Sequence, residues 1–173
     1  MNRPEPDVFA DQAMLYIPRL RRYARALTGD AAAADDLVQD ALERALVKRS
    51  LWQDGTDLRA WLFTVMHNVF VNQVRSAAAS RSVPLDDAIA DRAQPPATDR
   101  LEIRDLDRAL QALPDEQRTV VLLIGLEQMT YDEAAHVLEV PIGTVMSRLS
   151  RGRERLRRLL QGTPDASPLK VVK

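Results

Sequence analysis

The sequence predicts an all-α protein in which two small helical domains are joined by a flexible linker. Apolar residues recur at spacings of three and four over most of the chain, a pattern typical of amphipathic helices. No stretch combines two-residue alternation with β-branched residues, so strands are not expected. Residues 81–100 read RSVPLDDAIADRAQPPATDR, with three prolines and no helical period, which indicates a linker. We therefore expect domains at residues 1–80 and 101–161, followed by a disordered tail at 162–173.

The first domain is expected to begin with a helix over Asp11–Leu27. Pro18 lies inside this stretch and should either kink the helix or mark its true start. Gly29 is placed to end the helix in a left-handed conformation, and Asp30 can cap the next helix. That helix, Ala31–Lys48, should bury Leu37, Val38, Ala41, Leu42, Ala45 and Leu46. Its other face carries polar side chains, namely Asp35, Asp36, Gln39, Asp40 and Glu43.

A turn-rich loop, SLWQDGTD at residues 50–57, leads into the longest predicted helix of this domain. Asp57 can cap that helix, which should run from Leu58 to about Ala78. Its core stripe is expected to contain Leu58, Trp61, Leu62, Val65 and Val69. The opposite arc carries Thr64, His67, Asn68, Val71 and Arg75.

The second domain should open with helices between Leu101 and Ile124. Their apolar stripe is expected to pack as core and contains Ile103, Leu106, Leu110 and Leu113. Two further helices are predicted between Thr130 and Leu160, around a tight turn that ends at Pro141. Thr130 and Glu133 have the spacing of a capping box at the start of the first of these helices. The second should bury Ile142, Val145, Leu149, Leu156 and Leu159, with Gly152 at the centre of the stripe.

Charge is unevenly distributed along the chain. The formal net charge is −1, yet residues 141–173 hold eight basic and two acidic side chains, a local net of +6. Six of these are arginines on the second helix of a helix-turn-helix pattern, which indicates a surface for a polyanion such as DNA. The alternative is a solvated arginine face or a coiled-coil flank.

The composition argues against several other classes of protein. The chain has no cysteine, so disulfides and thiolate metal sites are excluded. Its two histidines are far apart in sequence, and it has no glycine-rich phosphate loop or metal-ligand cluster. We therefore expect no catalytic residue, no cofactor and no metal. No apolar run approaches the roughly 20 residues of a membrane span, so we expect a cytoplasmic protein without membrane insertion.

Three blocks of sequence, with the linker between the second and third, carry a family resemblance. The blocks are YARALTGDAAAADDLVQDALERAL, LRAWLFTVMHNVFVNQVR and ALPDEQRTVVLLIGLEQMTYDEAAHVLEVPIGTVMSRLSRGRERLRRLL. The first two resemble region 2, and the third resembles region 4, of the extracytoplasmic-function sigma factors. These are the minimal two-domain class of bacterial promoter-specificity subunits of RNA polymerase. The resemblance covers nearly the whole chain.

The resemblance implies roles for the first domain. Its acidic helix would dock on the clamp helices of core RNA polymerase through Asp35, Asp36, Gln39, Asp40 and Glu43. Its loop and third helix would capture a base flipped out of the promoter's minus-10 element, because stacking surfaces and amides can hold an extruded base. The residues implied in minus-10 binding are Leu51, Trp52, Gln53, His67, Asn68, Val71, Asn72 and Arg75. Trp52 has an alternative role, which is packing under the loop.

The resemblance also implies that the last helix reads the minus-35 element in the major groove of duplex DNA. The implied contacts are Thr144, Met146, Ser147, Arg148, Arg151 and Arg153. An arginine here can contact guanine in a bidentate manner, whereas many relatives carry a base-reading arginine where this chain has Met146. The first helices of this domain would help to grip the polymerase flap.

These roles imply three partners: core RNA polymerase, promoter DNA and an anti-sigma factor. Two other functions stay open at this point. One is a stand-alone helix-turn-helix regulator that would dimerise and bind a palindrome without polymerase. The other is a protein-interaction adaptor without promoter function, for which Met146 is the best support.

Overall fold

The computed structural model describes residues 8–53, 55–80 and 99–161, and every regular element within these ranges is helical. The linker region 81–98 and the tail 162–173, for which flexibility and disorder are expected, lie outside the described residues. The elements are α1 (Val8–Thr28), α2 (Ala31–Val47), a short 3₁₀ helix (Arg49–Leu51), α3 (Leu58–Ser80), α4 (Asp99–Gln111), α5 (Asp115–Gly125), α6 (Tyr131–Leu138) and α7 (Ile142–Leu160).

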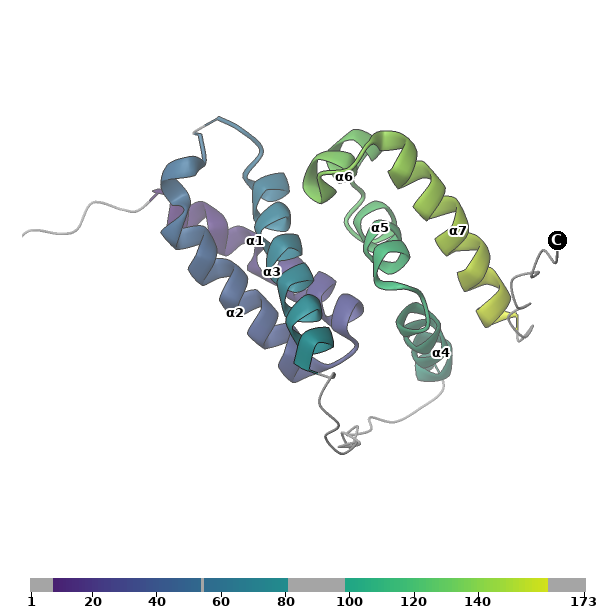
Figure 1. The fold of residues 1–173 in the computed structure, drawn as a ribbon. Helices are drawn as coiled ribbons and strands as arrows, with labels where there is room; N and C mark the ends of the chain where they lie inside the picture. The colour runs from purple at the N-terminus through teal and green to yellow at the C-terminus, as the bar shows by residue number, and fades with distance from the viewer. Residues whose placement is uncertain (1–7, 54, 81–98, 162–173) are drawn as a thin grey trace, which may run out of the picture.

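The helices form two groups that lie side by side (Figure 1). Helices α1, α2 and α3 pack on one another, and α5, α6 and α7 form the second group with α4 at one end. The two groups touch through α1 with α4 and α5, and through α3 with α6. The buried side chains form one continuous apolar cluster that runs through both groups.

The core of the first group follows the predicted stripes. Helix α1 buries Leu20, Tyr23 and Leu27, and the edge of the Tyr23 ring meets the Phe63 ring of α3 at a centroid distance of 5.1 Å. The predicted core positions of α3 are buried at Leu58, Leu62, Val65 and Val69, and half-buried at Trp61. Helix α1 begins at Val8, so Pro18 lies inside the helix, and of its two predicted alternatives the marking of a helix start is excluded.

One prediction about this group was wrong, because Leu46 was expected in the core and its side chain is exposed. Along the row Val38, Leu42 and Leu46, whose members are four residues apart, the side chains change from buried through half-buried to exposed toward the C-terminal end of α2. The apolar pattern therefore overestimated how far along α2 the buried face extends.

The helix caps that the sequence predicts for the first group are present. The side chain of Asp30 accepts a hydrogen bond from the backbone N–H of Ala33 at 2.8 Å, and Asp57 accepts one from Ala60 at 3.2 Å. Gly29 has a φ of +70°, the left-handed conformation expected for it. These local interactions fix where α1 ends and where α2 and α3 begin.

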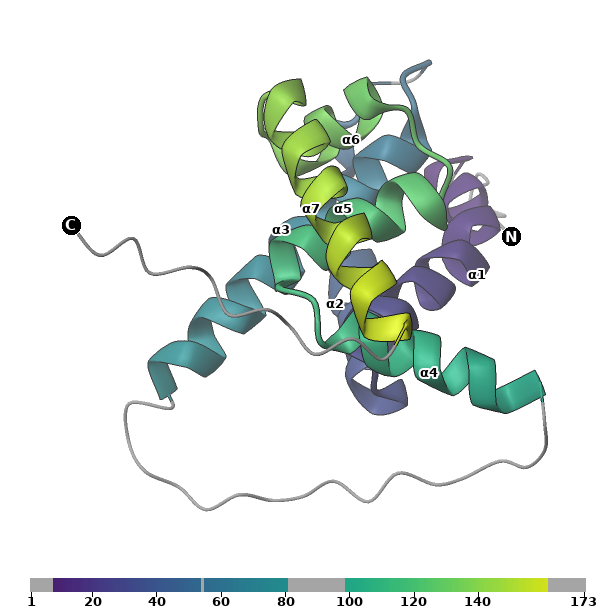
Figure 2. The ribbon, with the colours of Figure 1, turned by 90° about the vertical axis from the view of Figure 1, so that its right-hand side faces the viewer.

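The stretch predicted as helical between Leu101 and Ile124 is divided into α4 and α5, with Pro114 as the N-cap of α5. A residue before proline is biased away from the helical conformation, which explains the break after Leu113. Leu110 and Leu113 are buried as expected, but Ile103 is 65% exposed and Leu106 is also exposed. The reason is that α4 projects beyond the helices it contacts, so only its C-terminal part meets them (Figure 2).

Candidate nucleic-acid interface

Helices α6 and α7 form the predicted helix-turn-helix, and its capping box is present. The backbone N–H of Glu133 donates to the Thr130 hydroxyl at 3.2 Å, and the Thr130 N–H donates to the Glu133 carboxylate at 2.6 Å. This second bond, helped by the nearby Arg59 guanidinium, lowers the pKa of Glu133. Glu139 then takes a left-handed conformation with a φ of 54°, and Pro141 is the N-cap of α7. The turn between the helices is therefore short and locally determined.

One face of α7 packs against α5. Its buried residues are Val145, Leu149 and Gly152, while Leu156 and Leu159 are half-buried. Gly152 is needed for this packing, because a Cβ atom there would lie 2.8 Å from Cγ2 of Val121. Ile142 was expected in the buried stripe but is exposed, since it opens the helix at its first, uncovered turn.

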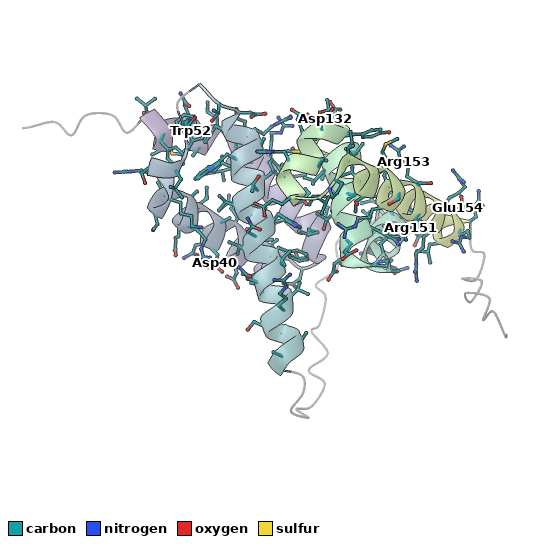
Figure 3. All side chains as sticks on the ribbon, turned by 45° about the horizontal axis from the view of Figure 1, so that its top comes forward. Asp40, Trp52, Asp132, Arg151, Arg153 and Glu154 are labelled. Atoms are coloured by element: carbon teal, nitrogen blue, oxygen red, sulfur yellow. The ribbon has the colours of Figure 1, made fainter. Side chains whose placement is uncertain are left out.

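The opposite face of α7, called the α7 outer face below, is exposed. It consists of Met146, Ser147, Ser150, Arg151, Arg153, Glu154 and Arg157. Figure 3 shows Arg151, Arg153 and Glu154 of α7 on one side of the molecule and Asp40 and Trp52 on the other, with Asp132 of α6 between Trp52 and Arg153. Ser150 is absent from the predicted set, although it lies one helical turn after Met146 and shares its face.

The six residues predicted to read the minus-35 element fall into two groups. Met146, Ser147, Arg151 and Arg153 belong to the α7 outer face, whereas Thr144 is half-buried. Arg148 points toward α5, where its guanidinium forms an ion pair with Glu116 at 2.9 Å and its side chain is mostly covered. In this arrangement Arg148 does not share the surface of the other arginines.

The five polar residues predicted to bind polymerase are all exposed along α2. The Gln39 amide donates to Glu43 at 3.0 Å, and the Gln73 amide of α3 donates to Asp40 at 2.8 Å. Asp35 lies 3.8 Å from the Arg21 guanidinium, a distance typical of a weak surface pair. The row presents carboxylates to solvent with little internal neutralisation.

A groove between α2 and α3 connects this acidic row with one of the predicted minus-10 residues. Asp40 and Glu43 of α2 line it together with Asn72 and Gln73 of α3. Polymerase-binding and DNA-binding candidates therefore share one continuous surface.

The loop residues predicted to capture a base are not equally available. Leu51 and Gln53 are exposed, but Trp52 is half-buried and its ring lies 5.6 Å from the ring of Phe9. The indole Nε1 is covered and has no hydrogen-bond partner among the described residues. The geometry thus favours the alternative of Trp52 packing under the loop.

On α3, the predicted minus-10 residues line a hollow that faces the second helix group. The hollow contains His67, Asn68, Val71, Asn72 and Arg75, and across from them Glu116, Glu139 and Arg148. Asn68, Asn72 and Arg75 are exposed, while His67 and Val71 are half-buried. Burial lowers the pKa of His67, the carboxylate of Glu139 opposes this shift, and the guanidinium of Arg148 adds to it.

A buried carboxylate joins the two helix groups. Glu127, between α5 and α6, is 0% exposed and accepts a hydrogen bond from Arg19 at 2.9 Å and from Arg22 at 2.9 Å, both on α1. Arg19 also donates to the Glu127 carbonyl at 3.1 Å. Sequence analysis missed this residue, because its partners lie more than one hundred positions away and no local pattern marks it.

Two further polar contacts lie along the same boundary, called the seam below. The Gln111 amide of α4 donates to the Ala26 carbonyl at 2.9 Å, and Arg59 of α3 pairs with Glu133 of α6 at 3.0 Å. The seam therefore combines hydrogen bonds and ion pairs with the apolar cluster that is continuous between the two groups.

Within the described residues, no cluster of histidine, aspartate or glutamate has the geometry of a metal site. Among those residues, no helix has the length and apolar character needed to cross a membrane.

Two family models match the chain, one in each helix group. The model described as "Sigma2 domain of PhyR" matches residues 14–67, and the model described as "Sigma-70, region 4" matches residues 103–156. The chain is 36% identical to the ECF RNA polymerase sigma factor EcfG of Rhodopseudomonas palustris, over 98% of this chain and 96% of that protein.

Solved structures resemble the fold as well. The sigma factor RpoE of Bartonella quintana, solved in complex with the anti-sigma factor NepR, matches with a TM-score of 0.72 and 36% identity. This match covers 88% of the present chain and 96% of RpoE. CnrH, solved in complex with the cytosolic domain of CnrY, matches with a TM-score of 0.68 and 25% identity, over 94% of this chain and 92% of that chain.

Proposed function

Because the chain belongs to the extracytoplasmic-function family of RNA polymerase sigma factors, we propose that it directs bacterial core polymerase to specific promoters. It reads a minus-35 duplex through α7 and captures an unpaired minus-10 strand through α3 and the preceding loop. The observation that carries this proposal is that one chain presents two surfaces of opposite charge, the exposed acidic row of α2 and the basic α7 outer face.

The α7 outer face has the chemistry of a DNA-binding surface. It carries three arginines and one glutamate, and the helix follows the tight turn of a helix-turn-helix. A helix of this kind enters the major groove, where arginines contact phosphates and guanine edges. Arg151 and Arg153 are the exposed candidates, and Arg148 joins them only if its ion pair with Glu116 breaks.

The minus-10 function rests on the exposed amides of α3 and on the loop tip. Asn68 and Asn72 offer donors and acceptors to a base edge, and Leu51 offers an apolar contact. Because Trp52 is packed on Phe9, it supports this loop from beneath and does not itself stack on the base.

Promoter binding requires the two helix groups to separate. Elements at minus-10 and minus-35 lie about 25 base pairs apart, or roughly 85 Å along B-form DNA. A compact chain of this length is only about 40 Å across. The 18 residues from 81 to 98 span at most about 60 Å when fully extended, which allows the required separation. We therefore assign the seam contacts to the protein that is not bound to promoter DNA.

An anti-sigma factor is the expected regulator. The similar proteins RpoE and CnrH were each solved with a bound partner, NepR and CnrY respectively. A partner of this kind would act by holding the two groups together and covering the α2 row.

The proposal is tested by the association of the purified chain with core polymerase. We expect Asp40→Lys to weaken association by about tenfold, because it places a cation where the basic clamp helices require an anion. Asp11→Lys, which reverses an exposed charge on α1 away from the α2 row, is the matched control and should bind normally. A wild-type chain that does not bind core polymerase would refute the proposal.

One observation favours a second candidate function for the chain. The family model that matches residues 14–67 is described as the sigma2 domain of PhyR, and the second candidate is a protein-interaction adaptor without promoter function. An adaptor of this type would need no exposed arginines on α7. Promoter-specific transcripts from the reconstituted holoenzyme would exclude it, and they would also exclude a stand-alone regulator that works without polymerase.

A further inference from the structure

The α7 outer face contains one large apolar side chain among polar and charged neighbours. Met146 is 51% exposed, although most of its neighbours on this face are serines and arginines. Tyr131, the first residue of α6, is 38% exposed. Both residues line the same shallow hollow between α6 and α7, with Arg153 and Arg157 at its rim.

We infer that Met146, supported by Tyr131, reads the 5-methyl group of a thymine in the minus-35 duplex. This inference rests on the proposed function, because it requires α7 to enter the major groove. Thymine is the base that presents an apolar group there, and side chains without hydrogen-bonding groups recognise it by contact. Met146 is suited to this role, since its flexible thioether side chain adapts to irregular apolar surfaces.

The neighbours of Met146 explain why contact outweighs hydrogen bonding at this position. The Ser147 hydroxyl donates to the Thr144 carbonyl at 3.0 Å, and the Arg151 guanidinium donates to the Ser147 carbonyl at 3.2 Å. Arg148 is turned away to Glu116. The Ser147 hydroxyl and the Arg148 guanidinium therefore already have partners within the protein, whereas the Met146 side chain is exposed beside them.

The arginines at the rim have a separate role. Arg153 and Arg157 lie on the side of the hollow away from the helix start, and Glu154 forms an ion pair with Arg157 at 2.5 Å. Guanidinium groups in these positions contact phosphates and set the register of the helix. Met146 then determines which base pair meets the exposed thioether side chain.

The test removes one methyl group from the DNA. A minus-35 duplex is first selected with the reconstituted holoenzyme, and each thymine is then replaced singly by deoxyuridine. Binding of the full-length chain is measured by fluorescence anisotropy. We expect one such replacement to weaken wild-type binding by about fourfold, the effect of one buried methyl group. The Met146→Ala variant should bind both duplexes equally, and Met146→Leu should keep the discrimination.

Leu160→Ala is the matched control, because Leu160 is an exposed apolar residue at the far end of the same helix. This variant should discriminate as the wild type does. The inference is overturned if the selected element contains no thymine, if no deoxyuridine replacement weakens binding, or if Met146→Ala retains the discrimination. In all three cases a specific duplex is still bound and the proposed function stands. Failure of selection to yield any duplex would instead refute the proposed function, and this inference with it.

Discussion

Trp52 and His67 were both predicted to contact the minus-10 strand, and the structure gives them different surroundings. Trp52 packs on Phe9, whereas His67 lies at the seam with a ring nitrogen, Nδ1, that is buried and has no partner among the described residues. Histidine with a buried ring prefers the neutral form. The state of His67 therefore depends on whether the two helix groups are in contact.

We expect the folded protein to lose stability in mild acid through His67. Burial lowers its pKa below the ordinary value of about 6.5. At a pH between the folded and the unfolded pKa of His67, the unfolded chain binds the proton more readily than the folded chain does. The stability that the neutral ring contributes is therefore fully present above the unfolded pKa, and it is lost as the pH falls through that value toward the folded pKa. An NMR titration of the His67 ring, with the urea-unfolded chain as reference, measures the shift.

His67→Gln provides the control for this expectation. Its unfolding free energy should fall less than that of the wild type between pH 7.5 and about pH 5.5. A His67 titration midpoint equal to that of the unfolded chain would contradict the burial of this ring at the seam.

Residue-level features were predictable from the sequence where the partner is close along the chain. The Asp30 cap and the Thr130–Glu133 capping box follow from spacings of three residues, and both are present. Glu127 and Arg148 could not be assigned in this way. Their ion-pair partners are on other helices, so only tertiary packing brings the charges together.

At the scale of elements, the packing of α7 against α5 determines how the α7 outer face is presented. Gly152 lies at the point of closest approach, where an added Cβ would meet Val121 at 2.8 Å and the Gln117 carbonyl at 3.4 Å. The sequence analysis placed Gly152 at the centre of the apolar stripe, and the close approach to α5 explains why a glycine stands there.

We expect Gly152→Leu to lower the free energy of unfolding by about 1–3 kcal/mol, the usual cost of overpacking a core. Gly143→Leu is the control, because no atom lies within 4 Å of a Cβ at that position of the same helix. Urea unfolding of both variants measures the difference. Equal stability of the two variants would show that α7 does not pack closely on α5 at Gly152.

Helix α4 shows where an apolar period is a poor guide to burial. The stripe containing Ile103 and Leu106 is regular, yet both side chains are exposed, and α4 projects beyond the helices that it touches (Figure 2). Periodicity defines which face of a helix is apolar, but the length of that face that is covered depends on the neighbouring elements.

At the scale of the whole molecule, the sequence predicted the two helix groups but not their contact. The polar contacts of the seam come from side chains scattered along the chain, and they lie beside the apolar cluster that runs through both groups. Arg19 and Arg22 remain partly exposed, while Glu127 is fully covered. Loss of both arginines would therefore leave a buried carboxylate without a partner.

We expect the double variant Arg19→Ala, Arg22→Ala to open the seam, because an unpaired buried charge costs about 3–5 kcal/mol and separation returns Glu127 to water. The chain has no cysteine, so two introduced cysteines on exposed positions, Lys48 and Gln161, can carry a donor and an acceptor dye. Energy transfer between the dyes should fall in the double variant.

Arg21→Ala is the control for this measurement, since Arg21 is on the same helix and, within the described part of the chain, pairs with Asp35 of α2 at 3.8 Å on the exposed surface. It should leave energy transfer unchanged. If the double variant also retains wild-type energy transfer, the arginines do not hold the seam closed.

Run-off transcription with core polymerase and the purified chain tests the central claim most directly. A template library containing fragments selected by the holoenzyme should give discrete transcripts that require the chain, each starting downstream of a shared pair of elements. Core polymerase alone and the chain alone are the controls. A chain that binds core polymerase and duplex DNA but yields no specific transcript would contradict the assignment as a promoter-recognition subunit.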